Sequence, residues 1–216
     1  MSAQTEFTGL SRRNVLISGA AAAALLGPTL PAAAKTASDL TVTEALRSRQ
    51  STRAFADRPV GPALLAELLW AAFGINRPDA GLHTAPSWHG AADVMVQVAT
   101  ADGVLAYDPA TDTAARGLTQ DIRPALSPQP FVATAPACLI FVSDLTRLQA
   151  ATSEDERRFW ATVNAAIAAE NAYLFAAARG LGTCLVGGLD RAAISQRLAL
   201  PQHLYPTFVQ PVGWPA

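Results

Sequence analysis

Apolar residues recur at helical spacing in the part of the chain that follows residue 40. Thr41 and Glu44 have the spacing of a capping box, which predicts a short helix that continues through Leu46. A second helix is expected to begin at Pro62 and to end at Gly74. Its apolar face consists of Leu64, Leu65, Leu68, Leu69, Ala72 and Phe73.

Two further helices are predicted in the second half of the chain. The longer one spans about 153–179, and its faces are rich in alanine, which would let another helix approach closely. We therefore expect it to lie at the centre of the domain or at a dimer interface. Gly180 and Gly182 would end it, and the shorter helix is expected over 191–198.

Strands are predicted where apolar residues alternate with polar ones or form short continuous runs. Residues 94–98 and 104–107 flank the turn signal Asp102-Gly103 and predict a β-hairpin. The run 137–142 is apolar throughout, as in a strand that is buried on both faces. Two more strands are expected, over 183–186 and 207–212.

Two segments carry no clear period. Residues 76–90 are expected to form a loop, and residues 108–130 an excursion with a short helix near Asp121. Helices and strands therefore mix without a regular βαβ order, which favours the α+β class, a mixed sheet flanked by helices.

The beginning of the chain has the features of an export signal. The pair Arg12-Arg13 is followed at once by the apolar run 15–30, which is shorter than the ~20 residues of a membrane-spanning helix. Ala32-Ala33-Ala34 then offers a cleavage site with small residues. We expect residues 1–34 to be a twin-arginine signal peptide and residues 35–216 to be one exported domain in the periplasm. A buried alanine-rich helix or an uncleaved anchor is the alternative.

Composition narrows the function classes. Half of the residues are apolar and the net charge is −1, so neither a mainly disordered chain nor a nucleic-acid-binding protein is expected. The two cysteines, Cys138 and Cys184, are too few for a metal site built from cysteine, and no metal is predicted. A disulfide between them is conceivable after export, although both fall in predicted interior strands.

Two segments contain candidate chemistry. In residues 49–53, two arginines and a serine could bind a phosphate group, although such charged runs are usually solvated surface. In residues 180–190, paired glycines would allow backbone N–H groups to approach a flat ligand. The second segment could equally be a plain strand-to-helix turn with Asp190 as the N-cap.

Taken in order, these segments resemble the FMN-dependent nitroreductase family, and most of all its short branch allied to azoline dehydrogenases. The resemblance covers residues 35–216 and rests on an ordered set of segments: the arginine–serine stretch before Phe55 and Pro59-Val60, residues 69–77, residues 84–87, residues 104–109, residues 180–190 and the Pro211-Val212-Gly213 ending. It implies a homodimer with FMN at the subunit interface, acting on small molecules without a stable membrane span.

The resemblance also implies which residues bind the cofactor. Arg49 and Ser51 match the positions that hold the phosphate, and Arg53 matches a basic residue near N1 and the C2 carbonyl of the flavin. Gly187 and Gly188 match positions whose N–H groups face N5 and O4. The other residues that match cofactor-binding positions are Gln50, Pro86, Ser87 and Val186.

Three departures from the family pattern predict weaker FMN binding than is typical. Gln50 replaces a second basic residue, and Gly90 falls where the family commonly has an asparagine that contacts the flavin. The end of the chain lacks the basic residues that many relatives place on the phosphate.

The expected function is hydride transfer between flavin and a small organic substrate by a ping-pong mechanism, and the alternative is a degenerate, non-catalytic binding protein. His83 and His89 are weak candidates for proton donors, since a histidine in a loop is more often structural. No other catalytic side chain is identified, because the cofactor would carry the chemistry.

Overall fold

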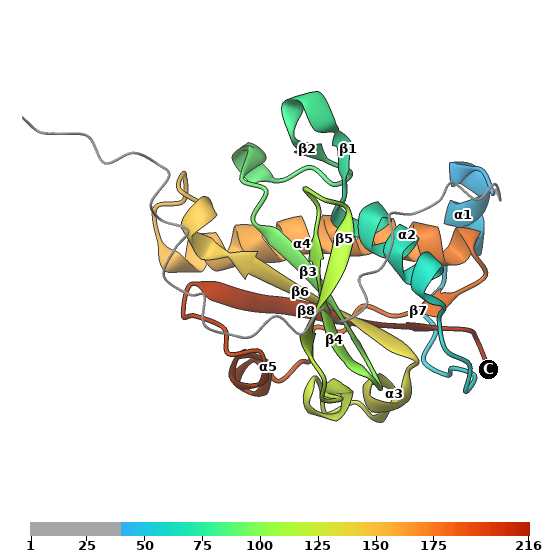
Figure 1. Cartoon of the computed structure of the whole chain (residues 1–216). Coiled ribbons are helices and arrows are strands. Elements are labelled where there is room, and N and C mark those ends of the chain that lie inside the picture. Colours follow the sequence, from blue (N-terminus) through green and yellow to red (C-terminus); the bar gives the residue numbers. More distant parts are fainter. Residues whose placement is uncertain (1–39) are drawn as a thin grey trace, which may run out of the picture.

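The computed structural model describes residues 40–216, so the predicted signal peptide lies outside the described residues. Six strands form one sheet in the order β5-β4-β3-β6-β8-β7, with every neighbouring pair antiparallel. They are β3 (Val94–Thr100), β4 (Gly103–Asp108), β5 (Thr113–Leu118), β6 (Ala137–Asp144), β7 (Gly182–Thr183) and β8 (Leu204–Gly213). The expected α+β class, with a sheet flanked by helices, is confirmed (Figure 1).

The helices cover both faces of this sheet. On one face lie α2 (Pro62–Phe73) and the long α4 (Glu154–Ala178), which passes behind the strands in Figure 1. On the other face lie α3 (Pro130–Thr134) and α5 (Arg191–Arg197). The short α1 (Val42–Ser48) packs against α4 near one end of the sheet.

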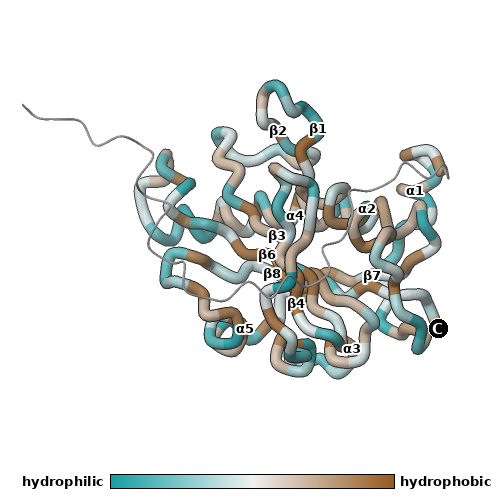
Figure 2. Tube along the Cα trace, viewed as in Figure 1, coloured by the Kyte–Doolittle hydropathy of each residue, from teal (hydrophilic) through white to brown (hydrophobic). Residues whose placement is uncertain are grey.

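Strand β6 divides the core into two layers. Leu139 and Phe141 belong to the cluster under α2 and α4, whereas Ile140 and Val142 belong to the cluster under α3 and α5. Because successive side chains of a strand point to opposite faces, a continuous apolar run serves both layers. The prediction that residues 137–142 are buried on both faces is confirmed, and the central strands are among the most hydrophobic segments in Figure 2.

The capping box that was predicted for the first helix is present. The Thr41 hydroxyl accepts a hydrogen bond from the Glu44 N–H, and the Glu44 carboxylate accepts one from the Thr41 N–H at 2.7 Å. A hydrogen bond from the Thr41 hydroxyl, together with this bond from the Thr41 N–H, lowers the pKa of Glu44.

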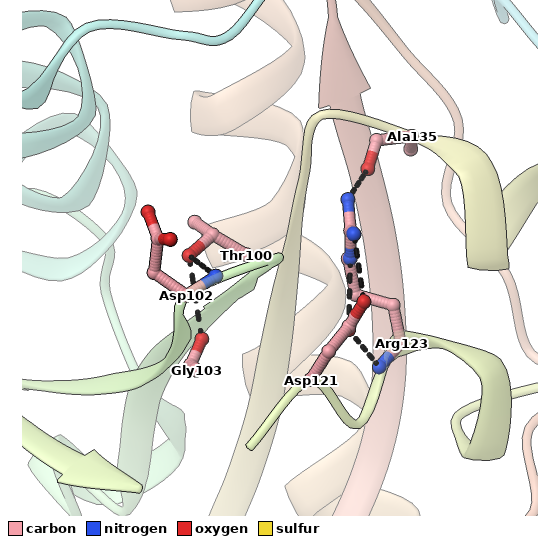
Figure 3. Close-up of polar contacts among 6 residues, drawn as sticks. All are labelled: Thr100, Asp102, Gly103, Asp121, Arg123 and Ala135. Atoms are coloured by element: carbon pink, nitrogen blue, oxygen red, sulfur yellow. Dashed lines mark hydrogen bonds and ion pairs between the residues drawn. The ribbon is translucent and has the colours of Figure 1, made fainter. Parts of the chain in front are cut away.

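The predicted hairpin is also present: β3 pairs with β4 from Gln97 opposite Ala106 to Thr100 opposite Gly103. The Thr100 hydroxyl accepts a hydrogen bond from the Asp102 N–H and donates one to the Gly103 carbonyl (Figure 3). Gly103 has a φ of +124°, and a Cβ there would meet the Leu118 carbonyl oxygen at 2.1 Å. Only glycine fits this position.

Several sequence predictions need correction. The excursion 108–130 contains β5, which pairs with β4, and the helix expected near Asp121 is a single 3-10 turn, Arg123–Ala125. The strand expected over 183–186 is shorter, because only Gly182–Thr183 pair regularly and Val186 makes an isolated bridge to Val209.

The segment 76–90 is not a plain loop. It contributes to a two-stranded sheet of β1 (Ile75–Arg77) and β2 (Leu82–His83), which projects from the domain at the top of Figure 1. A short 3-10 turn, Pro78–Ala80, connects the two strands. These elements were missed because they are two or three residues long, which leaves no periodicity to detect.

The end of α5 gives a first stability prediction. Ala199 has a φ of +49°, and the bonds from the N–H groups of Ala199 and Leu200 to the carbonyls of Gln196 and Ser195 form a Schellman motif. Because alanine is strained in this conformation, Ala199→Gly should raise the free energy of unfolding by about 1 kcal/mol. Urea denaturation measures this change. The control Ala192→Gly, within the same helix, should lower stability, and a loss in both variants would contradict the prediction.

Candidate functional site

The structure brings together the two segments that the sequence marked as candidates. They are the arginine segment (residues 49–53) and the glycine segment (residues 182–188, within the predicted stretch 180–190). Ser51 forms a parallel bridge with Thr183, and the Thr52 N–H donates to the Thr183 carbonyl at 2.8 Å. Gly182 lies directly under Thr52, because a Cβ at Gly182 would be 2.6 Å from the Thr52 Cβ.

Tyr173 of α4 joins the same two segments. Its hydroxyl lies 3.0 Å from the Ser51 Oγ and accepts a hydrogen bond of 2.7 Å from the Leu185 N–H. The Arg49 guanidinium lies 5.2 Å from the centre of the Tyr173 ring, in cation–π geometry. Sequence analysis did not assign this tyrosine to the cofactor site, since its contacts are with residues distant along the chain.

The arginine segment leaves its polar side chains available to a ligand. Arg53 and Gln50 are exposed, and Arg49 is half-buried. Among residues 40–216, the side chains of Arg49, Gln50 and Arg53 have no hydrogen bond or ion pair. Two cations and the Ser51 hydroxyl therefore lie at one edge of the domain, where an anion could approach.

At the other end of the glycine segment, Gly187 and Gly188 are exposed, whereas Val186 is buried against β8. The N–H groups of both glycines have no hydrogen-bond partner within the described part of the chain. Added Cβ atoms would find Phe208 at 3.6 Å and Gln129 at 3.4 Å. The backbone here offers two free donors on an open surface.

The Gly188 backbone is held by residues from the segment 108–130, which had been expected to form an excursion. The Ser127 hydroxyl donates to the Gly188 carbonyl at 2.6 Å and also accepts from the Gln129 N–H. Neither Ser127 nor Gln129 was a candidate from the sequence, since nothing in the local pattern places them near residue 188.

Contacts of Arg123 fix the segment 121–135, which contains Ser127 and Gln129 (Figure 3). Arg123 forms an ion pair of 2.7 Å with Asp121 and donates to the Ala135 carbonyl. The hydrogen bond from Arg123 lowers the pKa of Asp121. Arg123 is thereby a structural cation, and the glycine segment rests on a fixed support.

Asp190, two residues after the glycine segment, caps α5. Its carboxylate accepts a hydrogen bond of 2.9 Å from the Ala193 N–H. The simpler interpretation of this stretch, a turn that leads into a capped helix, is therefore correct for Asp190. It does not account for the exposed Gly187 and Gly188.

Pro86 and Ser87 begin a second region, the aromatic loop (residues 86–92). The Ser87 hydroxyl accepts a hydrogen bond of 2.8 Å from the Ala92 N–H, which closes the loop on itself. The Trp88 N–H donates to Asn164 of α4 at 2.9 Å. The Trp88 indole stacks on Trp160, which lies in α4 one helical turn before Asn164, and the two ring centres are 4.8 Å apart.

Asn164 links this loop to a buried carboxyl group. Its amide donates a hydrogen bond of 2.7 Å to Asp93, which is fully buried at the start of the sheet. Burial raises the pKa of Asp93, and the bonds from Asn164 and Ser143 and the charge of Arg147 oppose this effect. The second oxygen of Asp93 has no hydrogen-bond partner among the described residues.

Within one chain, the aromatic loop does not reach the arginine segment. The loop contacts α4 at Asn164, whereas the arginine segment contacts it at Tyr173. These positions are nine residues apart, which corresponds to about 13 Å and to opposite sides of the helix. The predicted cofactor residues therefore form two groups, one on each side of α4.

The two candidate histidines differ in their surroundings. The His83 ring stacks on Phe73 at 4.2 Å, and its Nδ1 lies 2.9 Å from the Phe73 carbonyl oxygen, which indicates a structural role. His89 is exposed, has a φ of +50° and lies edge-on to Trp88. Of the two, His89 is better placed to meet a ligand.

The cysteines are not positioned for a disulfide. Cys138 pairs with Pro211 on one side of β8, and the Cys184 N–H bonds the same proline from the other side. Two strand spacings separate them by roughly 10 Å, which exceeds the reach of a disulfide. Both thiols are free and buried, and burial raises the pKa of Cys138 to about 12.

In residues 40–216, no three histidine, cysteine, aspartate or glutamate side chains gather as metal ligands would. No helix in that same range combines the length and the apolar composition needed to cross a membrane.

Comparison with known proteins gives one consistent answer. The sequence model of the nitroreductase family matches residues 46–214. MJ1384 of Methanocaldococcus jannaschii, named as a nitroreductase, is 26% identical over 198 residues, which cover 87% of this chain and 98% of that protein.

Solved structures agree. The crystal structure of a nitroreductase from Ralstonia eutropha is 33% identical, with a TM-score of 0.81 and coverage of 90% of this chain and 93% of that one. A nitroreductase family protein from Clostridium novyi, 20% identical, has the same fold, with a TM-score of 0.60 and coverage of 82% and 86%. The chain belongs to the nitroreductase family, a family of oxidoreductases whose members generally use a flavin.

Proposed function

We propose that the protein is an FMN-dependent oxidoreductase that transfers hydride between the flavin and a small organic substrate by a ping-pong mechanism. One observation carries this proposal: the arginine and glycine segments, far apart in the sequence, pair at Ser51 and Thr183 and are joined by Tyr173. Cations for a phosphate and backbone donors for a flat ring thus belong to one surface.

The groups at this surface fit FMN. Arg49 and Ser51 supply a positive charge and a hydroxyl, which suit a phosphate monoester, and Arg53 supplies a second positive charge for the ring. The free N–H groups of Gly187 and Gly188 suit the polar edge of an isoalloxazine ring. Bound FMN would supply the hydride acceptor and donor that the side chains themselves lack.

Each residue then has a defined task. Arg49 and Ser51 hold the phosphate, and Tyr173 fixes the Ser51 hydroxyl in place. Arg53 would place a positive charge beside the ring, which would favour a reduced, negatively charged flavin. The Gly187 and Gly188 N–H groups orient the ring, and Ser127 keeps their backbone in position.

A second copy of the chain would complete the site. Pro86 and Ser87 match cofactor-binding positions, yet they lie on the opposite side of α4 from Ser51 and about 13 Å along it. A homodimer would let the aromatic loop of one protomer meet the arginine segment of its partner. We also propose that the protein belongs to the short branch of the family, which is allied to azoline dehydrogenases.

We also propose that the domain works outside the cytoplasm. The support is the order of Arg12-Arg13, the apolar run 15–30 and Ala32-Ala33-Ala34 in the sequence. Twin-arginine export carries folded proteins, which is compatible with a cofactor that is bound before export.

The spectrum of the purified protein and its affinity for FMN test the proposed cofactor. A yellow protein with a flavin spectrum that dithionite bleaches is expected, and Arg53→Ala should raise the Kd for FMN about tenfold, through the loss of about 1.4 kcal/mol of charge-assisted bonding. Arg197→Ala, at an exposed position of α5, is the control and should leave the Kd unchanged.

The alternative, a degenerate binding protein, predicts a different result. A colourless protein that FMN titration cannot saturate would contradict the enzyme proposal, and Gln50 and Gly90 would then explain the loss. An unchanged Kd in Arg53→Ala would refute the role of that arginine alone.

A further inference from the structure

A hollow of about 420 Å³ lies beside the aromatic loop, separate from the surface formed by the arginine and glycine segments. Its size falls in the range of small-molecule sites. The loop forms one wall through Trp88 and His89, and residues 147–150, which follow β6, form the other. Trp88, the first of the residues that line the hollow, directly follows Ser87, which matches a cofactor-binding position.

The described residues that line this hollow include a positively charged side chain and no negatively charged one. Arg147 is the only charged side chain that lines it within the described part of the molecule. That side chain is exposed and forms no hydrogen bond or ion pair with residues 40–216. The nearby Asp93 is fully buried and bonded to Asn164, so its carboxylate does not open into solvent. Arg147 acts electrostatically on the buried Asp93, but its guanidinium is exposed and the lining, as far as the structure describes it, has no acidic side chain, which favours an anionic ligand.

The opposite wall is aromatic and fixed. Trp88 stacks on Trp160 with an angle of 9° between the rings, and His89 meets the Trp88 ring at 78°. The bond from the Trp88 N–H to Asn164 holds the backbone of the same residue. A ring that is immobilised before binding contacts a planar ligand at little entropic cost.

The backbone of this loop is unusual. His89, Gly90 and Ala92 have φ values of +50°, +67° and +47°, in the left-handed region. For His89 and Ala92 this conformation is strained, and the bonds to Ser87 and Asn164 maintain it. Strain that is held in place by its surroundings is concentrated at ligand sites in proteins.

We propose that this hollow binds the substrate, and that the substrate is an aromatic ring that carries a carboxylate. Arg147 holds the carboxylate, and Trp88 lies against the ring. Naming this ligand as the substrate depends on the proposed function, in which the aromatic loop of one protomer meets the FMN-binding surface of its partner, whereas the binding site itself does not.

Calorimetric titration of the purified full chain with 2-naphthoate and its uncharged analogue 2-naphthamide tests the proposal. The carboxylate is expected to bind about tenfold more tightly than the amide. Arg147→Gln should abolish this preference, and Arg197→Gln, the control on α5, should retain it. Equal binding of the two probes by the wild type, or a preference that survives Arg147→Gln, would overturn the site.

The flavin content of the same preparations separates this proposal from the proposed function. A colourless protein with a preference that depends on Arg147 would support the site and refute the FMN enzyme. A yellow protein without the preference would refute the site alone.

Discussion

Replacing Asn164 with aspartate is expected to lower the free energy of unfolding at pH 7 by about 3 kcal/mol. Asn164 donates a 2.7 Å hydrogen bond to Asp93, and both side chains are buried. In Asn164→Asp, two carboxyl groups meet without the amide donor, and the burial of two like charges is strongly unfavourable. The bond from the Trp88 N–H can persist, because a carboxylate oxygen replaces the amide oxygen.

The loss should depend on pH in a defined direction. Burial already raises the pKa of Asp93, and a second carboxyl group would raise the pKa of the pair further. The folded variant then binds more protons than the unfolded chain, so its stability falls as pH rises above the ordinary range of a carboxyl group. The deficit relative to the wild type should be smaller at pH 5 than at pH 7, because a shared proton restores a bond between residues 93 and 164.

Urea denaturation at the two pH values measures this effect, and an exchanged pair supplies the control. The double variant Asp93→Asn with Asn164→Asp keeps one amide and one carboxylate, and it should recover at least half of the lost stability. A single variant with wild-type stability at pH 7, or a deficit that does not change with pH, would contradict the assignment.

Gly182→Ala is the second substitution with a large expected effect. Its Cβ would lie 2.6 Å from the Cβ of Thr52 and 2.8 Å from the Thr52 hydroxyl oxygen, which is closer than side chains tolerate. The arginine segment would have to move away from the glycine segment at the bridge between Ser51 and Thr183. We expect a loss of about 2 kcal/mol in the free energy of unfolding, as for other overpacked sites, and weaker FMN binding.

Thermal or urea unfolding, with FMN titration of the same samples, measures both effects. Gly187→Ala is the matched control for stability, since its Cβ would find Phe208 at an ordinary 3.6 Å. Adding Thr52→Gly to Gly182→Ala removes the opposing side chain and should recover part of the stability. If Gly182→Ala were as stable as Gly187→Ala, the contact between the two segments would be looser than described.

The residues of the candidate site were predicted unevenly. Arg49, Ser51 and the glycine pair are visible as local groupings of cations or glycines, and the resemblance to a family assigned them a role. Tyr173 and Ser127 carry no such local signal. Their importance comes from hydrogen bonds to Ser51 and Gly188, which are distant in the sequence.

The fold shows the same division. Strand β6 and helix α4 were predicted because long apolar runs and alanine-rich helical spacing are local properties of the chain. Strand β5 was missed, since the residues 113–118 have little intrinsic preference for a strand and become one by pairing with β4.

The sequence by itself determined the α+β class, the main helices and strands, and the chemical groups available for a phosphate and a flat ring. Only the tertiary structure decided which of these groups meet. It paired Ser51 with Thr183, and it placed the loop that holds Trp88 on the other side of α4. Periodicity and capping act over a few residues, whereas a site depends on contacts between segments whose separation along the chain carries no information about their distance in space.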